Sequence, residues 1–287
     1  MFSIKRAERA DGPVLRQNER DTGDGGKLEY LTFPSLEATE MVKHLFTTRL
    51  GGVSEGEFSS MNLSFTRGDQ ADHVAENYRR IGEALGCVPE NMIASHQTHT
   101  TNIRKVGRVD RGKGITRPRD YEDIDGLMTN VSGIVLVTYF ADCVPLFFVD
   151  TVHRAIGLAH SGWRGTVAGM GACMVRAMET AYGTRPEELS VAIGPSICAD
   201  CYEVGEDVAG QFGRFSGVVT PGRIQGKYQL DLREANRQNL LLAGVRSEKI
   251  AVTDICTCCN DSYLFSHRAS RGRRGNMGAF LGLKEIL

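Results

Sequence analysis

The chain has 287 residues, with 34 Lys and Arg side chains against 35 Asp and Glu, so its formal net charge is −1. Hydrophobic residues make up 41% and charged residues 24%, an ordinary globular composition that excludes disordered, collagen-like and coiled-coil proteins. The balanced charge argues against a nucleic-acid or anionic-membrane partner. No apolar run approaches the roughly 18 residues of a membrane helix, and the N-terminus lacks the apolar core of a signal peptide. We expect a soluble, cytoplasmic protein.

The first part of the chain predicts a polar segment, one amphipathic helix and one long loop. Residues 1–29 carry six basic and six acidic side chains, so we expect a polar N-terminal arm or short edge strands outside the core. A helix is expected over residues 71–85, with Asp72 as its cap. Its buried face would hold Val74, Tyr78, Ile81 and Leu85. Residues 107–123 are rich in glycine, proline and charge, which favours a solvated surface excursion over a flexible flap.

The middle and the end of the chain alternate between strand and helix patterns. Near-continuous apolar runs predict strands buried on both faces at residues 134–140, 144–149 and 155–159. A helical pattern follows Gly165. Later segments predict a strand at 191–193, a helix at 231–243 and a strand at 249–255. Strands interrupted by helices indicate an α/β or α+β fold of the kind that enzymes use.

The residues most typical of a functional site lie at the ends of the second and third of these strands. If Val149 pairs with Ala155 across the turn, Val144 pairs with His160. Cys143 and His160 would then emerge at the same end of the sheet, within reach of each other. The only tryptophan follows a glycine just after His160, and Arg164 next to it adds a positive charge suited to a phosphate or a carboxylate.

A third contributor comes from the histidines of residues 95–99. In an extended segment His96 and His99 face opposite ways, so only one of them would join Cys143 and His160. Two imidazoles and a thiolate make a three-ligand zinc site with one open position, which can activate water. Three alternatives stay open from the spacing alone. The histidines can be structural, Cys143 can be a small buried hydrophobe, or Cys143 and His160 can form a nucleophile–base pair without metal.

Several sequence blocks occur together in the order typical of one family. The blocks are 46–54 (FTTRLGGVS), 97–99 (QTH), 125–127 (DGL), 141–145 (ADCVP), 160–165 (HSGWRG), 192–197 (AIGPSI), 201–205 (CYEVG) and 265–268 (FSHR). The chain resembles the laccase-domain family, also called YfiH-like or multicopper-polyphenol-oxidase-like, whose members act as purine nucleoside phosphorylases. The resemblance covers residues 30–287, which we take as one catalytic domain, and leaves residues 1–29 unexplained.

The resemblance implies a fold, a metal site and an activity. It implies an α+β fold made of a single four-layer α-β-β-α domain with mixed β-sheets. It assigns the metal ligands to His99, Cys143 and His160, because the family pattern is Gln-x-His. The implied metal is Zn²⁺, with Cu²⁺ as an alternative. The implied reaction is phosphorolysis of adenosine, inosine and methylthioadenosine, with adenosine deamination as a companion activity, so the expected partners are a small nucleoside and phosphate.

The resemblance also suggests residues for substrate and proton transfer. Phosphorolysis needs cationic groups that hold phosphate, and the matched blocks offer Arg49, Arg164, His267 and Arg268. Arg49 is also a candidate catalytic residue, although it can equally pair with a buried carboxylate. Asp142 adjoins Cys143 and is the candidate proton carrier for deamination, with capping a turn or orienting a ligand as its alternative role.

One position departs from the family pattern. Members commonly have an arginine after the glycine that follows the Ser-His-Arg block, whereas Gly275 is followed here by Asn276. The neighbourhood offers Arg271, Arg273 and Arg274 instead, so one of these must replace the usual arginine if that arginine touches substrate.

The remaining cysteines form a second pattern. Eight cysteines are too few for a disulfide scaffold, so we expect thiols or metal ligands. Cys198-x-x-Cys201 and Cys256-x-x-Cys259, with Cys258 between, resemble two halves of a four-cysteine zinc site. The 54 residues between the halves exceed ordinary zinc-ribbon spacing, which favours close, redox-sensitive thiols over a zinc site.

Three other functions are weighed against phosphorolysis. A copper polyphenol oxidase needs several coppers and many histidines, and the chain has seven histidines. A hydrolase with Cys143 as nucleophile, acting on a cell-wall precursor, would be inactivated by thiol alkylation and not by a chelator. In a non-enzymatic regulatory protein the metal would only stabilise the fold. Such a protein would bind the ion but would not turn over any nucleoside.

Overall fold

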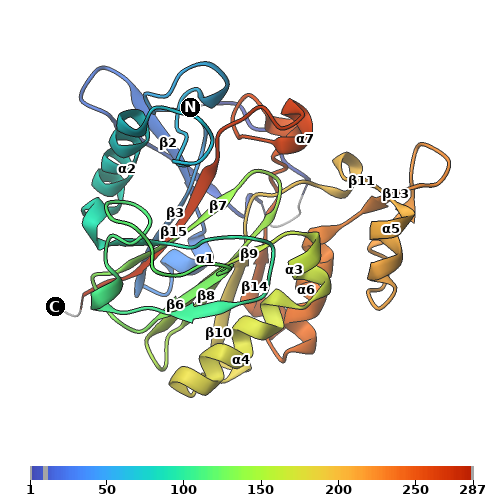
Figure 1. The fold of residues 1–287 in the computed structure, drawn as a ribbon. Helices are drawn as coiled ribbons and strands as arrows, with labels where there is room; N and C mark the ends of the chain where they lie inside the picture. Colours follow the sequence, from blue (N-terminus) through green and yellow to red (C-terminus); the bar gives the residue numbers. More distant parts are fainter. Residues whose placement is uncertain (1, 9–11, 286–287) are drawn as a thin grey trace.

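Two six-stranded β-sheets lie face to face in the computed structural model, which describes residues 2–8 and 12–285 (Figure 1). The first sheet has the order β1 (Arg16–Asp21), β2 (Lys27–Thr32), β3 (Val42–Thr47), β15 (Met277–Leu283), β7 (Val135–Phe140) and β4 (Met92–Ala94). The second has the order β14 (Ile250–Val252), β10 (Leu189–Ile193), β8 (Val144–Asp150), β9 (Ala155–Ser161), β6 (Gly126–Thr129) and β5 (Ile103–Lys105). Both sheets mix parallel and antiparallel pairs.

Helices cover the outer face of each sheet (Figure 1). Helix α2 (Ala71–Leu85) covers the first sheet, and α3 (Trp163–Val167), α4 (Met170–Tyr182) and α6 (Leu232–Leu242) cover the second. The shorter helices are α1 (Pro34–Glu37), α5 (Glu206–Ala209) and α7 (His267–Ser270). A small third sheet joins β11 (Glu203–Gly205), β13 (Lys227–Leu230) and β12 (Val219–Pro221). None of the helices in the described part of the chain is long and apolar enough to cross a membrane.

The alternation of buried side chains along the strands produces the layers. On β8, Phe147 and Val149 pack into the core between the sheets, whereas Leu146 and Phe148 pack into the core beneath α4 and α6. A third core lies between the first sheet and α2, where Tyr78 is fully buried. Three cores separate four layers, so the α-β-β-α architecture with mixed sheets is confirmed. The near-continuous apolar runs follow from this, because both faces of the central strands are covered.

Most predicted elements are found close to their expected places. Helix α2 has the predicted bounds and buries its four predicted residues, Val74, Tyr78, Ile81 and Leu85. The prediction of Asp72 as its cap was wrong, because Gln70 occupies the N-cap position without a side-chain cap bond. The helical pattern after Gly165 is divided into α3 and α4 at Gly169, whose positive φ of 78° ends the first helix.

Two segments that were predicted to lie on the surface contribute buried residues to the fold. Within residues 1–29, β1 forms an edge strand paired with β2, but Leu15 is 1% exposed and belongs to the core between the sheets. Loop 107–123 exposes residues such as Val109 and 116–118, as predicted, but it also holds buried residues that bind it to the first sheet. Its Lys113 is buried and lies 2.7 Å from the Asp110 carboxylate, and Gly112 donates its amide to Met92 in β4.

The β8–β9 hairpin has a register one residue away from the predicted one. Asp150, not Val149, pairs with Ala155, because the Asp150 carboxylate accepts the amides of Val152 and His153 and closes the turn one residue later. His160 therefore pairs with Pro145. A one-residue shift exchanges the two faces of a strand, so it is the observed register that turns Cys143 and His160 toward the same side of the sheet.

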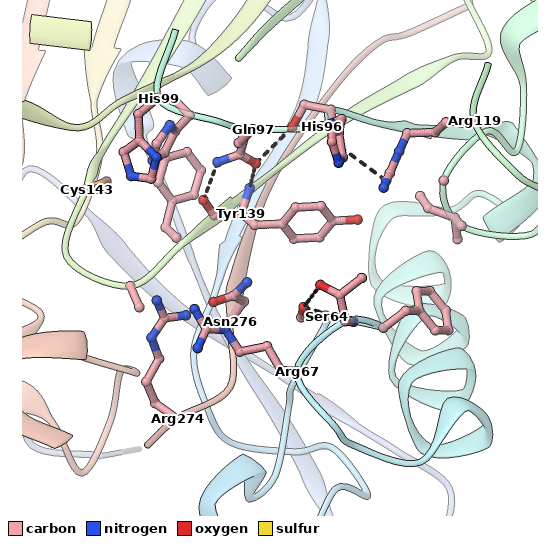
Figure 2. Close-up of a pocket in the computed structure, with 18 of the residues that line it drawn as sticks. Ser64, Arg67, His96, Gln97, His99, Arg119, Tyr139, Cys143, Arg274 and Asn276 are labelled. Carbon is pink, nitrogen blue, oxygen red and sulfur yellow. Dashed lines mark hydrogen bonds between the residues drawn. The ribbon is translucent and has the colours of Figure 1, made fainter. Parts of the chain in front are cut away.

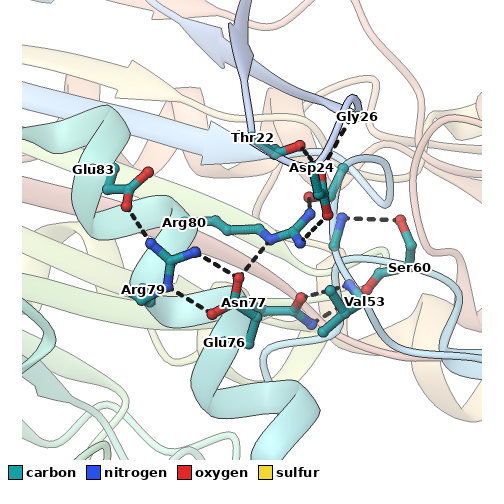
Figure 3. A network of polar contacts seen from close by, with 12 residues as sticks. Thr22, Asp24, Gly26, Val53, Ser60, Glu76, Asn77, Arg79, Arg80 and Glu83 are labelled. Carbon is teal, nitrogen blue, oxygen red and sulfur yellow. Dashed lines mark hydrogen bonds and ion pairs between the residues drawn. The ribbon is translucent and has the colours of Figure 1, made fainter.

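A polar network anchors α2 to the loop that leads toward the site (Figure 3). Asn77 is fully buried, donates to Ser54 Oγ at 2.9 Å and accepts the Val53 amide at 2.9 Å. Arg80 binds Glu76 at 2.9 Å and Asp24 in the β1–β2 turn. Asn77 also donates to the carbonyl of Asn62 at 2.8 Å, and the Asn62 side chain accepts the Ser64 amide at 3.0 Å. Because buried polar groups are costly when unpaired, these contacts fix the path of the chain as far as residue 64.

Candidate metal centre and its cavity

Three side chains from separate parts of the sequence meet at the junction of the two sheets. His99 follows β4, Cys143 lies where the chain passes from β7 in one sheet to β8 in the other, and His160 is on β9. One potential ligand atom from each lies within 4.8 Å of the others. The two imidazole rings are perpendicular, with centroids 4.9 Å apart. The structure thus brings together the predicted ligand set, and His96 lies apart from it (Figure 2).

One buried carboxylate, Asp125, organises two of the three side chains. It lies 2.7 Å from Nδ1 of His160 and accepts the backbone amides of Thr98, His99 and Thr100 at 2.9, 3.1 and 3.0 Å. Segment 95–99 is therefore not extended to its end, because three successive amides turn toward one carboxylate and His99 takes a positive φ of 68°. The contact holds the proton on Nδ1 of His160, which leaves Nε2 facing Cys143, as a metal ligand requires.

The charges of the site favour a thiolate next to a cation. Burial raises the pKa of Cys143, but His160 and His99 outweigh it and lower the pKa to about 6. Burial lowers the pKa of His160, but the Cys143 thiolate and Asp125 raise it to about 9. In the metal-free protein at neutral pH, a proton on His160 therefore balances the thiolate. A divalent cation between the two side chains would take the place of that proton.

The residues fit a tetrahedral metal ion. A methyl group on Gly162 would lie 2.8 Å from Cδ2 of His99 and 3.1 Å from Sγ of Cys143, so only glycine lets the backbone come this close to the two ligands. Two imidazoles and one thiolate suit zinc or copper(II) and leave one coordination position open. All three ligands line the same cavity, so the open position is accessible from it.

Replacing Asp125 with asparagine tests the positioning role of this carboxylate. The amide can offer its nitrogen to Nδ1 of His160, which favours the wrong tautomer, so we expect the affinity for zinc to fall by about 10- to 100-fold. Competition with a chromogenic chelator measures this affinity, and a melting curve checks the fold. Asp123→Asn, an exposed change of the same charge, is the control and should leave the affinity unchanged. Equal affinities for Asp125→Asn and the control would remove Asp125 from the site.

The cavity above the ligands has a volume of about 510 Å³, within the range of small-molecule sites. Aromatic groups line one part, among them Phe65, His96 and Tyr139. Gln97 fixes this wall, because its amide group exchanges two hydrogen bonds with the backbone of Tyr139, at 2.8 and 2.7 Å (Figure 2).

Four arginines line the cavity, namely Arg67, Arg117, Arg119 and Arg274. Arg67 and Arg274 lie side by side near Asn276 (Figure 2). Arg274 is only 9% exposed, and its Nε is buried without a hydrogen-bond partner among the described residues. Burial and the neighbouring Arg67 lower the pKa of Arg274 to about 10. A buried guanidinium beside a second cation has an unmet need for negative charge, which marks a binding position for an anion.

Arg274 lies close to Asn276, where the chain departs from the family pattern (Figure 2). Both residues line the cavity, whereas Arg273 is exposed and pairs with Glu57 and Arg271 is exposed at the end of α7. Of the three arginines that the sequence offered as a replacement, only Arg274 lines the cavity.

The four cations predicted to hold phosphate are not among the residues that line this cavity. Arg49 donates to the backbone carbonyls of Ser59 and Asp261 at 3.0 and 2.7 Å and stacks on Phe265. Its Nε and Nη1 thus bind carbonyl groups, not the buried carboxylate that the sequence offered as an alternative. In this arrangement Arg49 connects the loop at Ser59 to the loop at Asp261.

The other three cations lie on the surface. Arg164 is exposed and stacks on Trp163, and His267 is exposed on α7. Arg268 donates to the carbonyls of Cys201 and Glu203 at 3.1 and 3.0 Å. The matched blocks could not show which way these side chains turn.

Asp142 has both carboxylate oxygens occupied. It accepts the Thr257 hydroxyl at 2.6 Å and the Arg268 amide at 2.7 Å, and it takes a positive φ of 88° at the turn before Cys143. This geometry corresponds to the positioning alternative and leaves no free oxygen for a proton carrier. Sequence reasoning gave no role to Arg67, which lies in none of the matched blocks, or to Asp125, although block 125–127 contains it.

Comparison with known proteins gives consistent matches over most of the chain. The family model described as multi-copper polyphenol oxidoreductase laccase matches residues 43–284. The chain is 40% identical to "Purine nucleoside phosphorylase YlmD" of Geobacillus stearothermophilus over 83% of this chain and 89% of that protein. It is 32% identical to "Adenosine deaminase RL5" of an unknown prokaryotic organism, over 84% and 93% of the two chains. The crystal structure of YlmD from Geobacillus stearothermophilus superposes with a TM-score of 0.85 and 36% identity, over 96% of this chain and all of that one.

Proposed function

The chain belongs to the multi-copper polyphenol oxidoreductase laccase family, and from this premise we propose that it is a metal-dependent purine nucleoside phosphorylase. Its substrates would be adenosine, inosine and methylthioadenosine with inorganic phosphate, and its products the free base and a pentose 1-phosphate. One observation carries the proposal. The metal-ligand set and Arg274, whose Nε has no partner among the described residues, lie on the same cavity, so a phosphate and a nucleoside can bind next to each other.

The arginines supply the phosphate position. Arg274 and Arg67 would bind the phosphate dianion by charge-assisted hydrogen bonds, and the anion would in turn satisfy the buried Nε of Arg274. Holding the nucleophile and the sugar in one cavity converts a reaction between separate molecules into one between neighbours. The negative charge of phosphate beside C1′ also favours the positive charge that develops there in the transition state.

The aromatic wall would receive the purine. Phe65, His96 and Tyr139 offer flat apolar surface, and the cavity is large enough for a nucleoside. At the other end, His99, Cys143 and His160 would hold zinc, or copper(II) as the alternative. The ion would supply Lewis-acid polarisation of the bound substrate. Asp125 keeps the proton on Nδ1 of His160 and so maintains the ligand set.

Adenosine deamination is proposed as a companion activity. The relative named adenosine deaminase RL5 supports it, as does a metal centre open to a nucleoside cavity. Asp142 is not proposed as its proton carrier, because both of its oxygens are engaged.

A cysteine hydrolase is the second candidate, because the pKa of Cys143 near 6 would make it a thiolate beside His160 at neutral pH. Polyphenol oxidation by several coppers has less support, since among the described residues only one cluster joins two histidines.

Product analysis separates these functions. Adenosine is incubated with and without phosphate, before and after chelation, and the products are separated by chromatography. Adenine formed only with phosphate is the expected result, and inosine formed without phosphate would reveal deamination. Activity that survives chelation but is lost on thiol alkylation would favour the hydrolase.

A further inference from the structure

Four cysteines outside the cavity form a second cluster that the proposed reaction does not use. Their Sγ atoms all lie within 4.8 Å of one another, so the two Cys-x-x-Cys pairs, for which the spacing favoured close redox-sensitive thiols, form one group of four. The members are Cys198, Cys201, Cys256 and Cys259. We propose that these four thiolates bind a second metal ion, zinc, in a structural site.

The sheet topology explains how distant pairs meet. Strands β10 and β14 are parallel neighbours, and one Cys-x-x-Cys pair follows each of them at the same end of the sheet. The pairing continues as an isolated bridge between Ser196 and Cys256. The 54 intervening residues hold the small third sheet and α6, so the long gap is a crossover connection and does not separate the pairs in space.

The distances fit a metal and not a disulfide. Sγ of Cys259 lies 4.0 Å from Sγ of Cys198 and 3.5 Å from Sγ of Cys201. Thiolates about 2.3 Å from a tetrahedral zinc ion lie about 3.8 Å apart, whereas disulfide sulfurs lie about 2.05 Å apart. The two separations, 4.0 and 3.5 Å, fall on either side of the value for zinc.

Backbone amides stabilise negative charge on one of the sulfurs. Sγ of Cys256 accepts the amides of Cys198 at 3.2 Å and Cys259 at 3.4 Å. Amides directed at a metal-bound sulfur stabilise its negative charge. The buried guanidinium of Arg233 lies behind the cluster, where it binds the carbonyl of Ile255 at 2.7 Å and Oγ of Ser196 at 3.1 Å. A four-thiolate zinc site carries two net negative charges, which this cation would partly offset.

A metal ion in this cluster would hold in place the residues that position Cys143. The carbonyl of Cys201 accepts from Arg268, and the amide of Arg268 binds the Asp142 carboxylate. The amide of Ile197, next to Cys198, binds the Asp142 carbonyl at 3.0 Å. Asp142 directly precedes Cys143, so the cluster joins two strand ends to the turn that carries the catalytic metal ligand.

The test measures metal content and coordination without relying on activity. Wild-type protein expressed with zinc should carry two zinc ions per chain by mass spectrometry of the metal, one for each cluster with cysteine ligands. The Cys143→Ala protein should keep one. When that protein is reloaded with cobalt(II), its absorption should show tetrahedral cobalt with four thiolate ligands instead of one.

Substitutions identify the ligands. The double variant Cys201→Ser/Cys259→Ser should lose one zinc ion and melt at a lower temperature. Cys258→Ser is the matched control in the same short turn, since its sulfur is not one of the four, and it should keep both ions. If the double variant does not fold, the cobalt spectrum of Cys143→Ala still shows whether the four-cysteine cluster binds a metal ion. A folded Cys143→Ala protein without metal, or an intact mass that reveals a disulfide among these cysteines, would overturn the proposal.

Discussion

Replacing Cys143 with alanine is expected to abolish metal binding at the His99 and His160 site and to lower kcat/KM by about a thousandfold. The thiolate is the only anionic ligand of the three, so the remaining imidazoles would hold a divalent ion weakly. Lewis-acid stabilisation contributes several kcal/mol to a transition state, and about 4 kcal/mol corresponds to three orders of magnitude in rate.

The experiment combines metal analysis with steady-state kinetics on inosine. Cys173→Ala is the control, because this cysteine lies on α4, away from the cavity. The control should retain both metal and rate. A Cys143→Ala protein that has lost the cavity metal and still turns over at the wild-type rate would contradict a catalytic role for the ion. A second ion at the four-cysteine cluster does not confuse the result, since cobalt spectra distinguish the two sites.

Arg274→Gln should have opposite effects on activity and on stability. A charge-assisted hydrogen bond contributes about 1.5–3 kcal/mol, so losing the contact to phosphate should lower kcat/KM for phosphate by about 10- to 100-fold. The free protein, however, is relieved of a buried guanidinium whose Nε lacks a partner among the described residues. Its melting temperature should therefore stay the same or rise.

The matched control for this prediction is Arg273→Gln. Arg273 is the adjacent residue, but it is exposed and pairs with Glu57, so its loss should change neither the KM for phosphate nor the melting temperature measurably. The two variants are compared by titrating phosphate at saturating inosine and by calorimetry. An unchanged KM for phosphate in Arg274→Gln would remove Arg274 from the phosphate site.

The strands of the central layers could be predicted well from the sequence, because each strand is marked by a local run of apolar residues. The apolar runs around β7, β8 and β9 are strong because covered strands need apolar side chains on both faces. The register of the hairpin was missed because it depends on the side chain of Asp150, which closes the turn. A local pattern can reveal a strand, but a turn contact decides which face each residue presents.

The site could be predicted only in part from the sequence, for a related reason. The family resemblance located His99, Cys143 and His160 because these residues lie in motifs. The directions of arginine side chains are set by tertiary contacts, so Arg49 and Arg268 were predicted to hold phosphate although both are bound to backbone carbonyls. Arg67 lies three residues after Ser64, whose amide binds the Asn62 side chain next to Asn77, and nothing in its local sequence indicates that it meets Arg274.

Detection of ribose 1-phosphate by phosphorus NMR tests the central claim most directly. Inosine and phosphate are mixed with the metal-loaded protein, with the protein after chelation, and with the chelated protein after zinc is restored. We predict that ribose 1-phosphate forms together with hypoxanthine, that chelation stops its formation and that zinc restores it. If the folded, metal-loaded protein forms no ribose 1-phosphate from inosine or from adenosine, it is not a purine nucleoside phosphorylase.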